Sequence, residues 1–190
     1  MSADPALVVV RRARTGDVRA IRRLVDLYAP QRVLLSKATV TLYEDVPEFW
    51  VAESRADGAV VGCGALHVMW EDLAEVRTLA VDPAWRGRGV GHLLLTRLLA
   101  AARDLGVSRV FCLTFETRFF AAHGFVEIEG TPVDHEVFEQ LLQSYDEGVA
   151  EFLDLERVKP NTLGNARMLY RVPPSSLPGS APAPDDDQVS

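Results

Sequence analysis

The stretch that decides the fold reads EVRTLAVDPAWRGRGVG and spans residues 75–91. Its first part, Glu75 to Val81, has the apolar and β-branched character of a buried strand, and it stops at Asp82-Pro83. A glycine-rich turn follows, and after it apolar residues recur at helical spacing. A strand, such a turn and a long helix present backbone N–H groups and the positive end of a helix dipole at one point. The stretch therefore predicts a binding site for an anionic diphosphate.

The glycine-rich turn, taken alone, is equally compatible with a tight strand-to-helix connection that carries solvated arginines. In a phosphate site, Arg86 and Arg88 would add positive charge and forked N–H donors. Two other phosphate-binding loops do not fit. The turn lacks the Gly-Lys-Ser/Thr ending of a nucleoside triphosphate loop. Its glycine spacing, and its position after a later strand, also differ from the dinucleotide-binding fingerprint.

The rest of the chain surrounds this stretch with further strands and helices. We expect strands over residues 7–10, 49–52, 59–69, 75–81, 109–115 and 167–172 and just after Gly124, and helices over 15–28, 90–105, 116–123 and 138–145. The apolar face of the long helix comprises Val90, Leu94, Leu98, Ala101, Ala102 and Leu105, and Gly106 caps its end. The last helix is predicted from Phe138, Leu141, Leu142 and Tyr145. The fold class is α/β: a mixed central sheet of six to seven strands flanked by helices.

A change in composition divides the chain at residue 173. Five of the eleven prolines lie in 173–190, together with Ser, Gly and Asp and almost no large apolar residue. Such a segment cannot bury enough apolar surface to offset its ordering entropy. We therefore expect one folded domain over residues 1–172 and a disordered tail over residues 173–190.

Charge and composition exclude several classes of function. The net charge is −7, and Asp185, Asp186 and Asp187 in the tail contribute −3 of it, which leaves −4 on the rest of the chain. An acidic body argues against nucleic acid as a partner, because phosphate binding needs clustered positive charge. The only cysteines, Cys63 and Cys112, lie in apolar strands; they could pair, but such thiols more often act as small hydrophobes. No Cys/His cluster has the spacing of metal ligands. Without a signal peptide or an apolar run of membrane-spanning length, the expected location is the cytoplasm, with no membrane partner.

Two motifs resemble those of the GCN5-related N-acetyltransferase (GNAT) family. The pattern Arg86-x-x-Gly89-x-Gly91, preceded by LAVDP at residues 79–83, resembles the family's acetyl-CoA loop. The run FFAAHGF at residues 119–125 resembles its later helix that ends in Gly-Phe. The resemblance covers nearly all of residues 8–172 and implies an N-acetyltransferase domain with acetyl-CoA as cosubstrate and no metal. The residues it implies for cofactor binding are Leu79, Val81, Arg86, Gly87, Arg88, Gly89, Val90 and Gly91.

The family also implies a mechanism. Backbone groups of Leu79 and Val81 would pair with the pantetheine arm, and amides of residues 87–91 would hold the pyrophosphate. The amine attacks the thioester directly, and the N–H near Leu79 would stabilise the oxyanion. Glu75 is the candidate base, since on a regular strand it shares a face with Arg77 and Leu79; the alternative is an exposed residue paired with Arg77. Many family members place an acidic tyrosine where this chain has Phe120, so the acid is unassigned.

Within the family, the chain most resembles the acetyltransferase domain of N-acetylglutamate synthases. The residues that carry this resemblance are 34–37, 111–117, 159–161 and 165–168. It implies acetylation of the α-amine of L-glutamate, the first step of arginine biosynthesis, with L-glutamine as a plausible second acceptor. A dianionic acceptor needs cationic anchors, for which Lys37, Arg77 and Arg167 are the candidates; a solvated surface cation is the alternative for each.

Two other interpretations stay open. One is acetylation of a different amine, such as a polyamine, an antibiotic or a protein terminus. The other is an acetyl-CoA-binding module without turnover. The four histidines, His67, His92, His123 and His135, are scattered in the sequence and are expected in core or surface roles. A homodimer is compatible with the sequence.

Overall fold

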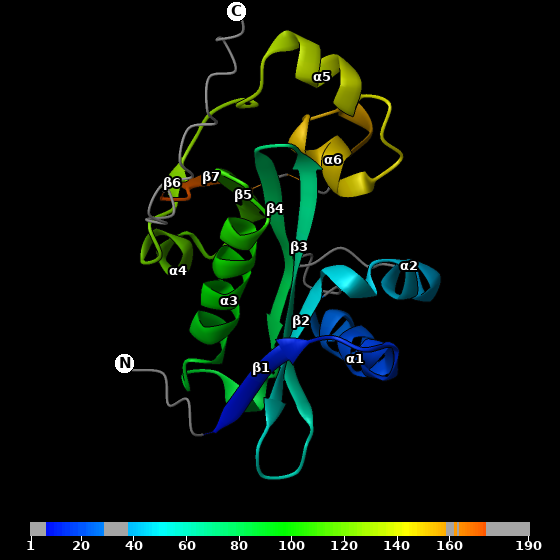
Figure 1. Cartoon of the computed structure of the whole chain (residues 1–190), viewed down its shortest axis with the longest axis vertical. Coiled ribbons are helices and arrows are strands. Elements are labelled where there is room, and N and C mark those ends of the chain that lie inside the picture. Colours follow the sequence, from blue (N-terminus) through cyan, green and yellow to red (C-terminus); the bar gives the residue numbers. More distant parts are fainter. Residues whose placement is uncertain (1–6, 29–37, 159–161, 163, 174–190) are drawn as a thin grey trace, which may run out of the picture.

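The computed structural model describes residues 7–28, 38–158, 162 and 164–173. In these residues one seven-stranded sheet has the order β1-β2-β3-β4-β5-β7-β6 (Figure 1). All neighbouring strands are antiparallel except β4 and β5, which are parallel. The strands are β1 (Val8–Arg12), β2 (Phe49–Ser54), β3 (Val60–Trp70), β4 (Leu73–Val81), β5 (Arg109–Thr114), β6 (Val126–Glu127) and β7 (Ala166–Arg171). The predicted α/β class with a mixed, helix-flanked sheet is confirmed.

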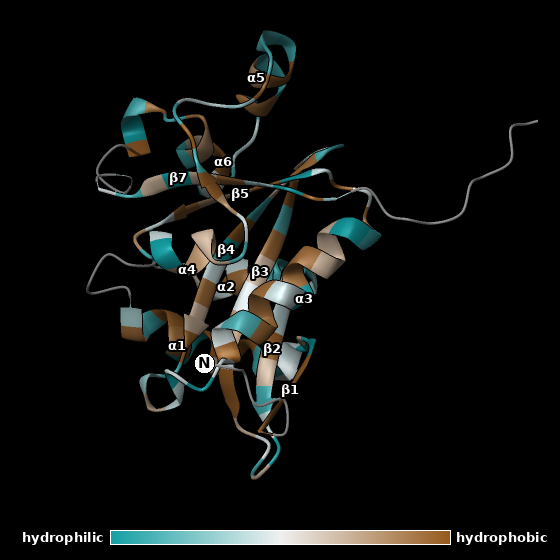
Figure 2. Ribbon diagram, turned by 90° about the vertical axis from the view of Figure 1, so that its left-hand side faces the viewer, coloured by the Kyte–Doolittle hydropathy of each residue, from teal (hydrophilic) through white to brown (hydrophobic). Residues whose placement is uncertain are grey.

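Helices cover both faces of this sheet. They are α1 (Val18–Tyr28), α2 (Thr39–Glu44), α3 (Val90–Asp104), α4 (Thr117–Ala121), α5 (His135–Leu141) and α6 (Glu147–Phe152), with short 3₁₀ turns η1 (Thr15–Asp17), η3 (Val46–Glu48), η4 (Pro83–Trp85) and η5 (Glu156–Val158). The long helix α3 packs on one face, and α1 lies on the other (Figure 2). Among the described residues no helix has the length and apolarity that crossing a membrane requires.

The face opposite α3 carries two separate apolar clusters. One joins α1 and α2 to the sheet and contains Ala65 and Ala80. The other joins α5 and α6 to the sheet and contains Met69 and Leu73. Each cluster therefore covers one end of the β3–β4 pair. The sheet residues between the clusters on this face are free to be polar, and the candidate site lies there.

The pairing of β4 with β5 is short. It comprises Leu73 with Arg109, Ala74 with Val110, and Glu75 with Phe111. Beyond these pairs the two strands have no further register partners, so β4 from Val76 to Val81 has an unpaired backbone edge on the β5 side. This is the divergence of strands at which the family resemblance places the pantetheine arm.

A β-bulge in β4 changes which side chains share a face. Ala65 pairs with Arg77 and Cys63 pairs with Ala80, so Gly64 faces two residues, and Thr78 has a left-handed φ of 57°. Leu79 consequently packs with the α3 cluster, whereas Arg77 contacts the α6 side of the sheet. The prediction that Leu79 shares a face with Glu75 and Arg77 is therefore wrong, because the bulge inverts the alternation.

Two apolar assignments from the helical patterns are also wrong. Leu105 is 57% exposed because α3 ends at Asp104 and Leu105 is its C-cap. Tyr145 is fully exposed, because the predicted helix over 138–145 ends at Leu141 and a new helix, α6, begins after Asp146. The Asp146 side chain starts that helix by accepting a hydrogen bond from the Val149 N–H at 2.9 Å.

Cys63 and Cys112 are both buried and unpaired, as expected of small hydrophobic residues. Burial raises the pKa of the Cys63 thiol to about 12, which keeps it protonated and unreactive at neutral pH. The tail predicted over residues 173–190 lies outside the described residues except for Pro173, and its disorder stays a prediction.

The close packing of α3 on the sheet gives a test of the fold. A Cβ at Gly62 would lie 3.0 Å from Leu94 Cδ1 and 3.2 Å from the Ala80 carbonyl oxygen. We expect Gly62→Ala to lower the free energy of unfolding by about 1–3 kcal/mol, because the backbone oxygen cannot yield as a side chain can. Urea denaturation would measure the change. Gly16→Ala, which meets nothing within 4 Å, is the control; equal stability of the two variants would contradict this packing.

Candidate active site

The turn between β4 and α3 is built for an anion. Asp82 caps the start of the 3₁₀ turn η4, where its side chain accepts a hydrogen bond from the Ala84 N–H at 3.0 Å. Gly87 and Gly89 then have φ values of 73° and 79°, a left-handed backbone that favours glycine. Gly89 is the N-cap of α3, and no side chain caps the helix. The N–H groups of the first turn of α3 therefore point at the turn without a side-chain acceptor, as an anion site requires.

Aromatic side chains hold the two arginines of this turn. The Arg86 guanidinium lies 5.3 Å from the centre of the Tyr28 ring and donates to the Tyr28 hydroxyl at 3.1 Å. That hydroxyl in turn donates to the Val81 carbonyl. Arg88 stacks over Trp85 at 5.0 Å. The tyrosine thus connects α1 to both ends of the turn, and each guanidinium keeps N–H donors for a ligand.

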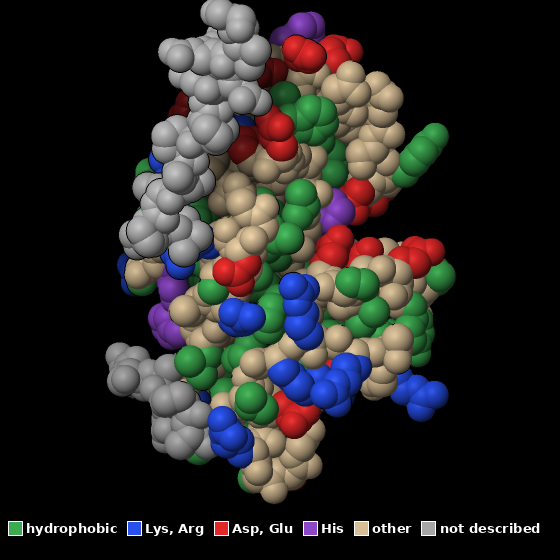
Figure 3. Space-filling view, viewed as in Figure 1, with side chains coloured by type: hydrophobic (Ala, Val, Ile, Leu, Met, Phe, Trp, Pro, Cys, Tyr) green, Lys and Arg blue, Asp and Glu red, His purple; other side chains and the backbone are tan. Residues whose placement is uncertain are grey.

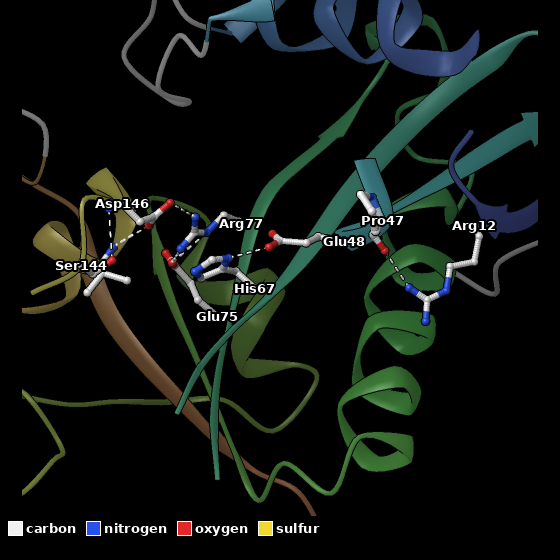
Figure 4. A network of polar contacts seen from close by, with 9 residues as sticks. Arg12, Pro47, Glu48, His67, Glu75, Arg77, Ser144 and Asp146 are labelled. Atoms are coloured by element: carbon white, nitrogen blue, oxygen red, sulfur yellow. Dashed lines mark hydrogen bonds and ion pairs between the residues drawn. The ribbon is translucent and has the colours of Figure 1, made fainter. Parts of the chain in front are cut away.

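A charged cluster lies between the two apolar clusters on the opposite face. Arg77 donates from Nη2 and Nε to Glu75 Oε2 at 2.7 and 3.0 Å, and from Nη1 to Asp146 Oδ2 at 2.9 Å (Figure 4). The Glu75 and Arg77 side chains are only 5% and 8% exposed. Glu75 is thus paired with Arg77, as the alternative interpretation held, but it is buried rather than exposed.

Electrostatics keep Arg77 and Asp146 of this cluster ionised. Burial alone would lower the pKa of Arg77, but the Glu75 and Asp146 carboxylates raise it above its usual range. Burial would likewise raise the pKa of Asp146, but its hydrogen bond and charge interaction with Arg77 lower it to about 2. Asp146 therefore stabilises the fold above the ordinary carboxyl pKa, and this contribution is lost only as the pH falls towards 2.

Helix α6 fits against Arg77 because of one glycine. A Cβ at Gly148 would lie 2.6 Å from Arg77 Nη2 and 3.1 Å from Asp146 Oδ1. No side chain larger than hydrogen fits there without moving the guanidinium or the cap. Asp146 and Gly148 were not predicted as site residues from the sequence; a D-x-G spacing at a helix start is their only local signal.

The structure places two of the three predicted acceptor anchors, Arg77 and Arg167, and gives them different partners. Arg77 lies beside Glu75, whereas Arg167 donates to the carbonyl oxygens of Gly130 and Glu151, at 3.0 and 3.1 Å, and to that of Phe152. Its guanidinium lies 5.0 Å from the Phe111 ring centre, and burial lowers its pKa. Arg167 thus binds the end of α6. Lys37 lies outside the described residues.

Sequence reasoning assigned no site role to His67. In the register of β3 and β4 it lies directly opposite Glu75, so both side chains point to the same face. Its Nδ1 is 2.7 Å from Glu48 Oε1. The turn at Glu71-Asp72 joins β3 to β4, but only a known register places this histidine opposite the glutamate. Phe120, by contrast, is buried, with its ring edge-on to Phe119 and Phe125, and provides no acid.

The surface is hollowed beside this cluster. Figure 3 shows a recess between the part of the molecule formed by α5 and α6 and the part formed by α1 and α2, with a histidine and acidic side chains at its border. Within the described ranges, no group of three or more His, Cys, Asp or Glu side chains could hold a metal ion. The arrangement therefore offers proton-transfer groups and a cation beside an opening in the sheet.

Comparison with protein families supports the predicted resemblance. The model of the "Acetyltransferase (GNAT) family" matches residues 19–127. An amino-acid acetyltransferase of Mycobacterium tuberculosis is 67% identical over 162 residues, which cover 85% of this chain and 92% of that protein. An uncharacterized N-acetyltransferase of Chlorobaculum tepidum is 38% identical over 120 residues, which cover 63% of this chain and 76% of that protein.

Two solved structures have a similar fold. Rv2747 from Mycobacterium tuberculosis, in complex with CoA and NLQ, superposes with a TM-score of 0.84 at 66% identity, covering 86% of this chain and 98% of that chain. The N-acetylglutamate synthase of Neisseria gonorrhoeae, complexed with coenzyme A and N-acetyl-glutamate, superposes with a TM-score of 0.69 at 27% identity. That match covers 90% of this chain but 36% of the synthase.

The glycine turn can be tested against a glycine of the same backbone conformation. Gly89→Val places a side chain where a pyrophosphate must approach, so we expect it to weaken acetyl-CoA binding at least tenfold by calorimetry. Gly106→Val, at the far end of α3, has a similar left-handed φ of 81° and nothing within 4 Å. It should suffer comparable backbone strain but bind acetyl-CoA normally. Unchanged cofactor affinity in Gly89→Val would remove the turn from the cofactor site.

Proposed function

The chain belongs to the acetyltransferase (GNAT) family, and on that premise we propose that it transfers the acetyl group of acetyl-CoA to the α-amine of L-glutamate, with L-glutamine as a second acceptor. Acetyl-CoA is its cosubstrate, as the CoA bound in its structural relatives indicates. The acceptor is proposed because its relatives include an amino-acid acetyltransferase and an N-acetylglutamate synthase. Such a reaction would begin arginine biosynthesis.

The observation that carries the proposal is the buried Glu75–Arg77 pair at the point where β4 leaves β5. We propose that the pantetheine arm enters this divergence along the backbone of Leu79 and Val81. The amides of residues 87–91 and the guanidinium groups of Arg86 and Arg88 would bind the pyrophosphate. This arrangement brings the thioester to the end of the β4–β5 pairing, beside Glu75.

In the proposed mechanism Glu75 acts as the base. An ammonium has no free lone pair, so the carboxylate must remove a proton before the nitrogen attacks the thioester carbon. The N–C bond forms, a tetrahedral adduct collapses, and the C–S bond breaks without an acyl-enzyme. An N–H near Leu79 would stabilise the oxyanion. Phe120 offers no acid, and a thiolate is a sufficiently good leaving group to depart before it takes up a proton.

We retain Arg77, Arg167 and Lys37 as proposed anchors of the acceptor carboxylates. Three of the five N–H groups of Arg77 are used by Glu75 and Asp146, and three of those of Arg167 are used by carbonyl oxygens. Each guanidinium thus keeps two N–H groups for an incoming carboxylate. Lys37 would supply the remaining charge from the segment that follows α1.

A second candidate function is acetylation of a cationic amine. Two carboxylates, Glu75 and Asp146, surround the single guanidinium of Arg77, so this part of the site is not positively charged overall. The excess of one negative charge, from two carboxylates against one guanidinium, would suit a cationic polyamine. A thiol-release assay with acetyl-CoA and a panel of amino acids, polyamines and peptide amines separates the two functions. Turnover of polyamines alone would refute the amino-acid acceptor, and no turnover with any amine would indicate a binding module.

Substitution of the proposed base tests the mechanism. Glu75→Gln keeps the shape of the side chain and removes its basicity, so we expect kcat near neutral pH to fall about 10²–10⁴-fold. Part of the rate should return at high pH, where free amine is abundant. The control is Glu53→Gln, which removes a carboxylate of β2 that pairs with Arg11 of β1 and should keep the wild-type kcat. Wild-type turnover with an unchanged pH profile in Glu75→Gln would make Glu75 a structural residue.

The acceptor anchors can be tested through Lys37. A charge-assisted hydrogen bond contributes about 1.5–3 kcal/mol, so Lys37→Met should raise the KM for glutamate roughly ten- to a hundredfold and spare that for acetyl-CoA. Glutamine, which lacks the side-chain charge, should lose less. Steady-state kinetics with both acceptors measure this, with Arg22→Met on exposed α1 surface as the control. An unchanged KM for both amino acids would remove Lys37 from the site.

A further inference from the structure

The chemistry of amine acetylation requires two proton transfers from one nitrogen. A substrate ammonium carries three protons on nitrogen, and the product amide carries one. One of the two lost protons ends on the sulfur of CoA, and the other leaves to solvent. If Glu75 is the base, as proposed above, its carboxylate holds one proton at a time. It must therefore pass the first proton to another group before it can accept the second. A second proton acceptor beside Glu75 would meet this requirement.

The structure holds one basic group opposite Glu75. His67 is its register partner across β3 and β4, so the two side chains stand next to each other on one face of the sheet. Figure 4 shows the imidazole beside the Glu75–Arg77 pair. The His67 side chain is 21% exposed, while that of Glu75 is 5% exposed. The histidine therefore lies between a buried carboxylate and the solvent.

A carboxylate fixes the orientation of this imidazole. Glu48, the last residue of η3, lies with Oε1 at 2.7 Å from His67 Nδ1. A carboxylate oxygen accepts hydrogen bonds, so the contact suits a tautomer in which Nδ1 donates to Glu48 and Nε2 is left for another partner. The other oxygen, Glu48 Oε2, is buried and has no hydrogen-bond partner in the described part of the chain. Among the described residues, the His67 ring is therefore the hydrogen-bond partner of the Glu48 carboxylate.

Charged side chains from several elements lie around His67. Glu48 faces it from η3, Glu75 and Arg77 from β4, and Asp146 from the start of α6. Three carboxylates and one guanidinium surround the ring, so the local charge is negative. The charge of His67 is also among the influences that hold the pKa of Asp146 low.

We propose that His67, oriented by Glu48, relays the proton from Glu75 to solvent during acetyl transfer. Glu75 takes the first proton from the ammonium and passes it to Nε2 of His67, and the free amine attacks the thioester. The restored carboxylate then takes the second proton from the adduct nitrogen as the C–S bond breaks, and that proton ends on the departing sulfur. His67 releases its proton to solvent, and Glu48 keeps the imidazole oriented throughout.

His67→Gln and Glu48→Gln test the relay in the full chain, using whichever amine the wild type acetylates. We expect kcat to fall at least tenfold in His67→Gln and less in Glu48→Gln. The KM for acetyl-CoA should be nearly unchanged in both. The pH profile of kcat in His67→Gln should lose the ionisation of an imidazole and rise with hydroxide concentration. His135→Gln, a histidine at the exposed start of α5, is the control and should keep the wild-type rate and profile.

Chemical rescue separates proton transfer from a structural role. Added imidazole should restore turnover of His67→Ala, and a series of substituted imidazoles should restore it in the order of their basicity. A wild-type rate and pH profile in His67→Gln would overturn the relay. So would a lowered melting temperature with a lowered rate that no imidazole restores. The proposed acceptor is tested separately by the panel of amines on the wild-type protein, because that assay does not depend on a change at His67.

Discussion

Backbone pairing between β4 and β5 stops after Glu75 and Phe111, and the rest of the site follows from where it stops. Two parallel strands bonded along their whole length would satisfy each other's N–H and C=O groups and close the sheet. By diverging, they leave the edge of β4 unpaired and open the sheet from the α3 face to the opposite face. The bulge at Thr78 then directs Leu79 to the first face and leaves Arg77 on the second. The same short stretch of β4 thus presents side chains to both faces of the sheet beside its unpaired edge.

Residues whose role is set by their own neighbours in the chain could be predicted from the sequence. The glycine turn is such a case, because Gly87 and Gly89 need a left-handed backbone that follows from local geometry. The bulge is not such a case, since threonine has no preference for a positive φ and adopts it here where the β3–β4 register shifts between Cys63 and Ala65. The His67–Glu75 pairing depends on strand register, which that bulge and another irregularity shift. Sequence periodicity therefore identified the strands but assigned Leu79 to the wrong face.

The buried ion pairs at the site are expensive to keep. Taking Glu75 and Arg77 out of water costs several kcal/mol per ion, and their mutual attraction offsets this only with good geometry and full hydrogen bonding. Apolar residues of similar size would fill the space between the two apolar clusters at less cost. The charges are better explained by chemistry than by folding, since they occupy the one region of this sheet face that neither cluster covers.

Helix α6 has six residues, too few to be stable in isolation. Its start is capped by Asp146, which also binds Arg77, and the carbonyls at its end are bound by Arg167. Its persistence thus depends on the same charges that form the site. We therefore expect α6, Arg77 and Arg167 to open together in hydrogen exchange, with less protection than the central strands. Such an opening would rearrange the Glu75–Arg77–Asp146 cluster and leave the turn between β4 and α3 folded.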